Sequence, residues 1–385
     1  MREITPSAKN RVLEDFFAKY SDSPTIVARA PGRVNLIGEH TDYNEGFVLP
    51  IALPFDTVIA ANPVEGSDVT VFSEDFGETT FNLDDDPFDT PSWARYLHGV
   101  GVFLRSTGMP VNGWAGCIAT DVPIGANLAS SAALEVAAGL VYSSLADSEI
   151  DLRRIAQCGQ YVENHFFGLP SGIMDQLTCA LAKPDSALWI DCQDLSTRTV
   201  LLPEGLSIVV MDTGTRRELV GTEYANRRST CERVANALGV RSLRNATLED
   251  LNQLDKSDGS QFKRARHVIS ENRRTEMAVD ALRSNDLVGL GVLMNDSHRS
   301  LQLDFEVSSP ALDEIVRVAF NSEYCFGARM TGGGFAGCAI AIVETGAVGR
   351  FCKEVTSGFR APQSQPAEIP TRVFPVRASA GASLI

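Results

Sequence analysis

The amino-acid sequence predicts an α+β protein built from two domains. The chain has 385 residues, which is long for a single domain. Strand-like and helix-like stretches are mixed in both halves of the chain. A polar, turn-rich stretch at residues 193–205 separates the halves. We therefore expect one domain over residues 1–200 and a second over residues 201–385.

In the first half, the spacing of apolar residues distinguishes strands from helices. An amphipathic start leads into a strand-like stretch with inserted turn residues at 25–53. Ser171 is predicted to be a helix N-cap, because its hydroxyl can accept a hydrogen bond from a backbone N–H group. Gly168 is predicted to end the preceding helix. The expected elements are a helix at 93–108, a strand at 114–122, helices from 131, at 152–168 and at 171–182, and a strand at 187–192.

The second half shows the same mixture of elements. The basic segment KRARHVISENRR at 263–274 is predicted to be the solvated face of a helix, as charge runs usually are. The expected elements are a strand at 206–214, a helix at 218–240, charged helices at 247–300, a strand, Gly-rich turn and strand at 324–344, and a last strand at 371–377. Both halves therefore agree with an α+β fold.

Composition excludes several classes of protein. The net charge of −15 argues against a broad nucleic-acid surface, whose affinity comes mainly from phosphate neutralisation. No apolar run reaches the roughly 18 residues that suggest a membrane span. Met1 is followed by polar residues rather than an apolar signal segment. The eight cysteines are scattered and form no CxxC pair, which fits reduced thiols. We expect a cytoplasmic monomer.

The segment PIGANLASSAA at 123–133 has the parts of an anion-binding loop. It joins a strand to a helix, whose first N–H groups lack intrahelical partners and carry the positive end of the helix dipole. Small residues let a phosphate approach, and the hydroxyls of Ser130 and Ser131 can contact phosphate or phosphate-bound Mg²⁺. No Gly-Lys-Ser/Thr follows, so the segment is not a Walker loop. An ordinary N-capped helix is the alternative if the segment is taken alone.

Other stretches place this loop in a larger pattern. APGRVNLIGEHTDYNEG (30–46) and GARMTGGGFAGC (327–338) form an ordered trio with the loop. GLPSGIMDQ (168–176), ELVGTEYANRRSTCE (218–232) and SHRSLQLDFEVSSPALDEI (297–315) extend the pattern over nearly the whole chain. On these motifs the sequence resembles the GHMP small-molecule kinases. EHTDY distinguishes their galactokinase branch from mevalonate and homoserine kinases.

The resemblance implies a fold and an activity. It implies an N-terminal domain like ribosomal-protein S5 domain 2 and a C-terminal ferredoxin-like domain, with the active site between them. It also implies transfer of the γ-phosphoryl group of MgATP to a sugar hydroxyl. In the galactokinase branch the acceptor is the C1 hydroxyl of α-D-galactose. The expected cofactors are ATP and Mg²⁺, and the expected partner is a small sugar.

Two residues carry the catalytic role that the resemblance implies. Asp175 matches the catalytic aspartate and is predicted to lie in the first turn of its helix, where the dipole favours the charged form. It can accept the proton of the C1 hydroxyl or orient that hydroxyl. Arg33 is expected near Asp175, holding it ionised and stabilising transition-state charge. The alternatives are an aspartate that only satisfies a helix end and a structural arginine.

The other site residues also follow from matched motifs. The implied sugar-binding residues are Glu39, His40, Thr41 and Asp42, with Asp175 and Tyr224. The implied ATP-binding residues are Gly125, Ala126, Asn127, Leu128, Ala129, Ser130 and Ser131, with the aromatics Trp93 and Tyr96 near the adenine. The implied Mg²⁺ partners are Ser131 and Glu163, which suffice because Mg²⁺ takes few protein oxygens plus phosphates and water. Packing alone is the alternative for Tyr224, Trp93 and Tyr96, and a plain hairpin is the alternative for Thr331 to Gly337.

The sequence departs from the family pattern at several positions. Asn127 and Ala129 replace a Gly and a Ser of the loop, and Ala336 replaces a Gly of the third motif. Asn tolerates left-handed backbone angles, so the loop is expected to work but to bind ATP more weakly. Gln302-Leu303 replaces a common Arg-Asp pair, which could change charge pairing at the substrate rim.

Two alternatives to a galactose kinase stay open at this point. The first is a kinase for galactosamine, N-acetylgalactosamine or arabinose. The second is a sugar sensor without catalysis, which the retained Ser131-Ala132 pair argues against.

Overall fold

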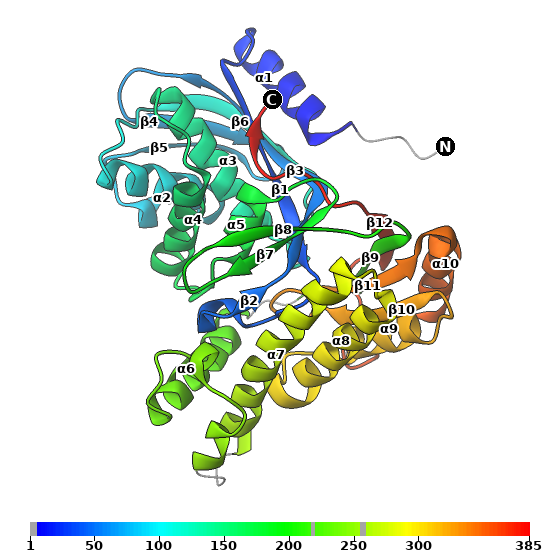
Figure 1. Cartoon of the computed structure of the whole chain (residues 1–385). Helices are drawn as coiled ribbons and strands as arrows, with labels where there is room; N and C mark the ends of the chain where they lie inside the picture. The colour runs from blue at the N-terminus through cyan, green and yellow to red at the C-terminus, as the bar shows by residue number, and fades with distance from the viewer. Residues whose placement is uncertain (1–5, 217–219, 255–258) are drawn as a thin grey trace.

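A computed structural model of the chain describes residues 6–216, 220–254 and 259–385 (Figure 1). The helices are α1 (Ala8–Tyr20), α2 (Ser92–Ser106), α3 (Ser130–Leu145), α4 (Leu152–Phe166), α5 (Met174–Leu181), α6 (Val220–Ala237), α7 (Gly259–Arg283), α8 (Leu287–Ser300), α9 (Pro310–Phe320) and α10 (Val348–Gly358). The strands are β1 (Ile26–Asn35), β2 (Phe47–Val48), β3 (Pro50–Pro63), β4 (Asp68–Ser73), β5 (Gly77–Asn82), β6 (Trp114–Thr120), β7 (Ser186–Asp191), β8 (Thr197–Leu201), β9 (Leu206–Asp212), β10 (Cys325–Met330), β11 (Cys338–Glu344), β12 (Arg372–Val376) and β13 (Ser383–Leu384). Helices and strands are mixed in both halves, as the sequence predicts.

The first half is organised around a six-stranded sheet in the order β13-β1-β3-β6-β4-β5. Side chains alternate across its central strand β3, because successive strand residues point to opposite faces. Val58 and Ala60 pack with α1, whereas Ile59 and Ala61 belong to the large core cluster on the opposite face. Helices α2 to α5 cover that opposite face (Figure 1). The sheet therefore supports the helices that carry the phosphate loop and Asp175.

The second half contains a four-stranded antiparallel sheet in the order β10-β11-β9-β12. This sheet is also buried on both faces. Val209 and Met211 of β9 contribute to a cluster with α9 and α10, whereas Ile208 and Val210 join the large cluster that continues into the first half. The two halves therefore share buried apolar surface, and the division at residue 200 stays a prediction.

Two strands connect parts of the chain in ways that sequence patterns did not show. The turn-rich stretch at 193–205 contains β8, which pairs with β7 in a three-stranded sheet with β2. The C-terminal β13 pairs with β1, so the end of the chain returns to the first sheet (Figure 1). Such long-range pairing leaves no local pattern in a two-residue strand.

Two local predictions were wrong. Helix α5 begins at Met174 with Ile173 at the N-cap, and Ser171 instead donates its hydroxyl hydrogen to Glu163. The segment 263–274 lies in α7, as expected, but it is not simply a solvated face, because His267 and Glu271 are fully buried. A charge run predicts exposure only if no neighbouring element supplies partners.

Among the described residues, no helix is both long and apolar enough to cross a membrane.

Candidate active site

A cavity of about 250 Å³ lies where β1, the phosphate loop (123–133), α5 and the third Gly-rich motif (327–338) meet. It gathers most of the side chains and loop residues that the sequence singled out. The predicted residues that line it are Arg33, Glu39, His40, Asp42, Gly125, Asn127, Leu128, Ala129, Ser130, Ser131, Glu163, Asp175 and Tyr224. Gly332 and Gly333 of the third motif also line it. Segments from both halves of the chain therefore form one site.

Arg33 and Asp175 form a bidentate pair at the centre of the cavity. Nε of Arg33 donates to Oδ1 of Asp175 at 2.7 Å, and Nη2 donates to Oδ2 at 2.5 Å. Asp175 lies in the first turn of α5, as predicted, and its side chain keeps 27% exposure. Nη1 of Arg33 donates to the backbone oxygen of Asn127 at 2.7 Å. The arginine therefore connects the aspartate to the phosphate loop, and the planar guanidinium fixes the angle between them.

Glu39 forms a buried ion pair with Arg329. Its Oε2 accepts from Arg329 Nη2 at 2.7 Å, while its Oε1 accepts from the backbone N–H of Gly332 at 2.8 Å. Burial raises the pKa of Glu39, whereas Arg329 and Arg33 oppose that rise. The side chains of Arg329 and Glu39 are 0% and 2% exposed. This pair joins the sugar-binding motif to the third motif.

His40 and Tyr224 form an aromatic wall. Their ring centroids are 5.5 Å apart, and Phe305 packs 4.9 Å from the His40 ring. Nδ1 of His40 lies 2.9 Å from the Tyr43 hydroxyl. Burial lowers the pKa of His40 well below its ordinary value, so the imidazole is neutral and can both donate and accept. The wall combines apolar faces with polar atoms, which suits a sugar ring.

Asp42 lies beside Asp175 at the sugar-binding side of the cavity. Burial, followed by the charge of Asp175, raises the pKa of Asp42 to about 7, although the N–H groups of Tyr43 and Met174 oppose the rise. Gly172 makes room for it, because a Cβ at that position would lie 1.9 Å from Oδ2 of Asp42. The carboxyl group therefore changes its charge close to neutral pH.

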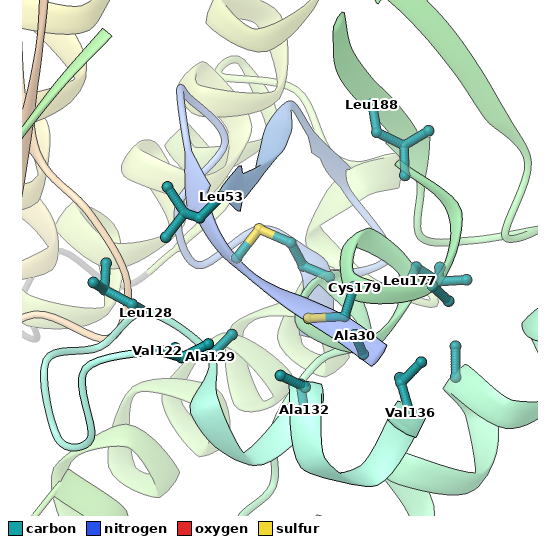
Figure 2. Packing of buried hydrophobic residues seen from close by; sticks show 14 of the residues in the cluster. Ala30, Leu53, Val122, Leu128, Ala129, Ala132, Val136, Leu177, Cys179 and Leu188 are labelled. Atoms are coloured by element: carbon teal, nitrogen blue, oxygen red, sulfur yellow. The ribbon is translucent and has the colours of Figure 1, made fainter. Parts of the chain in front are cut away.

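The phosphate loop contains two left-handed residues other than glycine. Asn127 has φ of +61° and Ala129 has φ of +62°. The side chain of Asn127 donates through Nδ2 to the backbone oxygen of Ala336 at 3.0 Å. Two departures from the family pattern thus meet, and the loop is tied to the third motif. Leu128 and Ala129 are buried in the large core cluster, as are Val122 and Ala132 on either side of them (Figure 2).

We expect the double variant Asn127→Gly/Ala129→Ser to have a lower KM for ATP. Asn127 has a left-handed backbone, which glycine adopts without a steric penalty, so Asn127→Gly relieves strain in the loop. The added serine hydroxyl also supplies a donor. Steady-state kinetics with varied ATP would measure the effect. An unchanged KM would show that the substitutions do not weaken the site, and Asn127→Gly alone serves as the control that relieves strain without adding a hydroxyl.

Ser131 and Glu163 place two oxygens side by side at the start of α3. The Ser131 hydroxyl donates to Oε1 of Glu163 at 2.8 Å, and the Ser171 hydroxyl donates to Oε2 at 2.6 Å. Burial raises the pKa of Glu163, and these two hydrogen bonds oppose the rise. Within the described part of the chain, no group of three or more His, Cys, Asp or Glu could hold a metal. A hydroxyl and one carboxylate fit an ion that keeps phosphate and water as its other ligands.

A second cavity of about 190 Å³ adjoins the phosphate loop and shares Ser130 and Ser131 with the first. Trp93 and Tyr96 both line it, as does Phe76. The rings of Trp93 and Phe76 are stacked, with centroids 5.7 Å apart and an interplanar angle of 14°. An apolar slot with stacked aromatic rings beside a phosphate loop suits a purine base.

Replacing Trp93 by alanine should raise the KM for ATP with little change in the KM for the sugar. The substitution removes the stacked ring from the second cavity but leaves the first cavity untouched. Stacking of a base on an aromatic ring is worth about 1–3 kcal/mol, which corresponds to a rise in KM of about 5- to 150-fold. Phe17→Ala removes a 65% exposed ring that lines neither cavity and is the matched control. Equal changes in both KM values would contradict the assignment.

Two predicted ligand-binding residues do not line either cavity. The Thr41 hydroxyl lies 2.8 Å from the backbone oxygen of Gly38 and 2.7 Å from that of Phe47, and Thr41 is fully buried. Thr41 therefore stabilises the turn and has no free hydroxyl hydrogen for a sugar. Ala126 is also fully buried and belongs to the core cluster. For both positions, direct contact with a ligand stays a prediction.

The departure at 302–303 also lies outside these two cavities. Gln302 Nε2 donates to Asp313 at 2.8 Å, and Leu303 is 49% exposed. Neither residue lines the first cavity. The effect that the sequence suggested at the substrate rim is therefore not seen in the cavity lining.

Sequence reasoning missed Glu271, which accepts hydrogen bonds from the backbone of the sugar-binding motif (residues 39–42) and of the preceding Gly38. Its Oε1 accepts from the backbone N–H groups of Gly38 and Glu39 at 3.0 and 3.3 Å and from the Ser297 hydroxyl at 2.6 Å. Although burial raises the pKa of Glu271, Arg274 and its other partners lower it to about 2. A signal was present, since Val268, Glu271 and Thr275 follow the spacing of a buried helical stripe.

Three comparisons with known proteins agree with this site. Residues 14–63 match the galactokinase galactose-binding signature, residues 96–183 match the GHMP kinases N terminal domain, and residues 278–361 match the GHMP kinases C terminal family. A galactokinase of Chloroflexus aggregans is 42% identical over 355 residues, which cover 90% of each chain. A galactokinase of Roseiflexus is 40% identical over 353 residues, again covering 90% of each chain.

Solved structures show the same relationship. Lactococcus lactis galactokinase, which was crystallised with galactose, has a TM-score of 0.91 and 31% identity, and the match covers 98% of this chain and 100% of that one. Methanococcus jannaschii mevalonate kinase has a TM-score of 0.65 at 18% identity, covers 93% of this chain and 99% of its own, and shares the fold. Motifs, fold and relatives thus converge, and the chain belongs to the galactokinase family of the GHMP kinases.

Proposed function

We propose that this chain is an ATP-dependent galactokinase, which phosphorylates the C1 hydroxyl of α-D-galactose to give galactose 1-phosphate and ADP. One observation carries the proposal above the others. The Arg33–Asp175 pair lies in one cavity with the phosphate loop and with the sugar-binding motif. Phosphoryl transfer depends mainly on positioning and on charge stabilisation, and this cavity supplies both.

The reaction assigns a separate task to each side of the cavity. Asp175 accepts a hydrogen bond from the C1 hydroxyl and is placed to take its proton as the new O–P bond forms. The bond between the β,γ-bridging oxygen and the γ-phosphorus breaks, and ADP leaves with that oxygen. Arg33 and the N–H groups at the start of α3 face the developing negative charge. Glu39, His40, Asp42 and Tyr224 bind the remaining sugar hydroxyls.

We further propose that Ser131 and Glu163 hold Mg²⁺ together with the phosphates of ATP. The ion would neutralise charge on the β- and γ-phosphate oxygens. The support is the pair of adjacent oxygens in these two side chains, 2.8 Å apart. Titration of magnesium binding in the presence of a non-hydrolysable ATP analogue, with Glu163→Gln as the comparison, would test this role.

The remaining parts of the proposal concern assembly and location. A monomer is proposed, and sedimentation velocity would test it. A cytoplasmic location is proposed because all eight cysteines lie in described residues and are free thiols. Fractionation of cells that produce the protein would test the location.

The decisive experiment measures ADP release from MgATP with galactose, glucose, galactosamine, arabinose and N-acetylgalactosamine. Turnover on galactose with little on glucose would support the proposal. Turnover on another of these sugars would show that this sugar, and not galactose, is the substrate, and the assignment as a kinase would stand. Sugar binding by calorimetry without any turnover would instead support a sensor.

The KM for galactose should fall as the pH rises through about 7. Because burial raises the pKa of Asp42 to about 7, its carboxyl group is protonated below that pH and ionised above it. Only the ionised form offers both oxygens as acceptors to sugar hydroxyls. The dependence should disappear in Asp42→Asn. A wild-type KM that stays flat between pH 6 and 8, while kcat is measurable, would contradict this role.

A further inference from the structure

A buried carboxyl group below the active site has no place in the reaction described above. Glu135 of α3 and Gln176 of α5 are both 0% exposed. Nε2 of Gln176 donates to Oε2 of Glu135 at 3.0 Å. The other carboxyl oxygen, Oε1 of Glu135, has no hydrogen-bond partner among the described residues. Oε1 of Gln176 is equally without one.

Glu135 and Gln176 are hydrogen-bonded to each other, yet each side chain keeps one acceptor oxygen without a partner. This arrangement requires an explanation. A buried polar atom without a partner costs about 1–3 kcal/mol, and both atoms here are acceptors as they stand. A single proton on Oε1 of Glu135 converts one of them into a donor. The acid and the amide then have complementary edges, with N–H to oxygen on one side and O–H to oxygen on the other.

The surroundings favour the neutral acid. The groups that act on Glu135 include Glu163 of α4 and Asp175 of α5, which are both acidic. Tyr96 of α2, Cys158 of α4 and Cys179 of α5 also interact with it, and none of them is a cation. Burial, followed by the charge of Glu163, raises the pKa of Glu135 well above its ordinary value, and only the hydrogen bond from Gln176 opposes this.

Gly159 of α4 shows that the chain keeps room for this pair. A Cβ at Gly159 would lie 2.7 Å from Oε2 of Glu135 and 2.9 Å from Cγ of Gln176. Gln176 directly follows Asp175 in α5, whereas Glu135 lies one turn after Ser131 in α3. The contact thus connects the helix of the phosphate loop to the helix of the catalytic aspartate.

We propose that Glu135 is a protonated positioning residue, which forms a cyclic acid–amide pair with Gln176 and fixes α5, and with it Asp175, against the phosphate-loop helix. The effect on catalysis rests on the proposed kinase function. The protonation state and the pairing do not depend on it. A neutral pair suits this position, because a charge here would repel Asp175 and Glu163.

Infrared difference spectroscopy tests the protonation state without any substrate. The carbonyl band of a protonated carboxyl group should persist at mildly alkaline pH, above the range in which Asp42 titrates, and should lose intensity in Glu135→Gln. Glu149→Gln, which removes an exposed carboxylate, is the control and should leave the band unchanged. Identical spectra for the wild type and Glu135→Gln would overturn the proposal, whatever the activity of the enzyme.

Kinetics test the positioning role. Glu135→Gln replaces the acid by an amide that can still donate to and accept from Gln176, so kcat for galactose should stay close to the wild-type value. Glu135→Leu removes both hydrogen bonds, and the resulting shift of Asp175 should lower kcat by about 100-fold, with a smaller change in the KM for galactose. A loss in Glu135→Gln as large as that in Glu135→Leu would show that the charge matters and would overturn the proposal.

A residue swap provides a folding-based test that needs no turnover. The single variant Gln176→Glu places two buried carboxyl groups next to each other. Both groups bind protons more tightly in the folded chain than in the unfolded one. The melting temperature of this variant should therefore fall as the pH rises. The double variant Glu135→Gln/Gln176→Glu restores one acid and one amide, so its pH dependence should return to the weaker one of the wild type. A swap that melts like the single variant at every pH would overturn the pairing.

Discussion

Replacing Asp175 by asparagine should abolish galactose phosphorylation and leave galactose binding largely intact. The amide keeps the size of the side chain, and its oxygen can still accept from Arg33. It cannot take the proton of the C1 hydroxyl, and it presents an N–H group where a carboxylate oxygen stood. Loss of a positioned base lowers kcat by about 10²- to 10⁴-fold. Coupled assay of ADP release gives kcat, and calorimetry gives the dissociation constant for galactose.

Asp191→Asn is the matched control for this variant. Asp191 accepts two hydrogen bonds of 3.0 Å from Arg244, and it does not line either cavity. It therefore shares the bidentate arginine contact but not the position, and its kcat should be close to that of the unmodified chain. A near-normal kcat in Asp175→Asn would reject the role of Asp175. A small residual rate would not, because charge stabilisation by the rest of the site persists.

Replacing Arg329 by methionine should strongly destabilise the folded chain. The arginine is fully buried, pairs with Glu39, and donates through Nη1 to the backbone oxygens of Asn35 and Leu36 at 2.9 and 3.3 Å. Methionine leaves the Glu39 carboxylate without its ion-pair partner. Removal of one partner of a buried ion pair typically costs about 3–5 kcal/mol. Urea denaturation would measure the loss, and the KM for galactose should rise because Glu39 lines the cavity.

The double variant Glu39→Gln/Arg329→Met separates the charge from the packing. With no carboxylate left unpaired, it should recover part of the lost stability but not the affinity for galactose. Arg377→Met removes an exposed arginine from its pair with Asp185 and should have no measurable effect on unfolding. If Arg329→Met unfolds at the same urea concentration as Arg377→Met, the buried pair does not stabilise the fold.

Local rules predicted most elements of secondary structure, but they were weaker at the ends of those elements. Helix α4 begins after Asp151, whose side chain accepts from the N–H groups of Arg153 and Arg154, as expected for an N-cap. The Ser171 side chain could also accept a hydrogen bond as an N-cap, but its hydroxyl donates to Glu163 instead. The choice between these partners depends on how close α4 comes to the 168–173 turn, and no pattern within one segment contains that distance.

In the candidate site, too, the motifs identified some residues correctly as lining the cavity and others not. The side chains of Arg33, Asp175, Glu39 and Asp42 carry recognisable chemistry, and the motifs around them were enough to single them out. Thr41 belongs to the same run of polar residues, yet its hydroxyl is used by the turn. Within a tight turn, the backbone geometry decides which side chains face the cavity. Residue type alone cannot distinguish a ligand from a support.

By itself, the sequence determined the kinase family of this protein and its α+β class, and it singled out the loop at 123–133 and the pair Arg33 and Asp175. These follow from motifs and periodicities that lie within short stretches of chain. Only the tertiary structure decided that Glu271 and Arg329 would support the sugar-binding motif, that β13 would close the first sheet, and that Glu135 would lie against Gln176. Those contacts join residues far apart in the sequence. Their energies come from burial, which desolvates a charged or polar group and makes its partner indispensable.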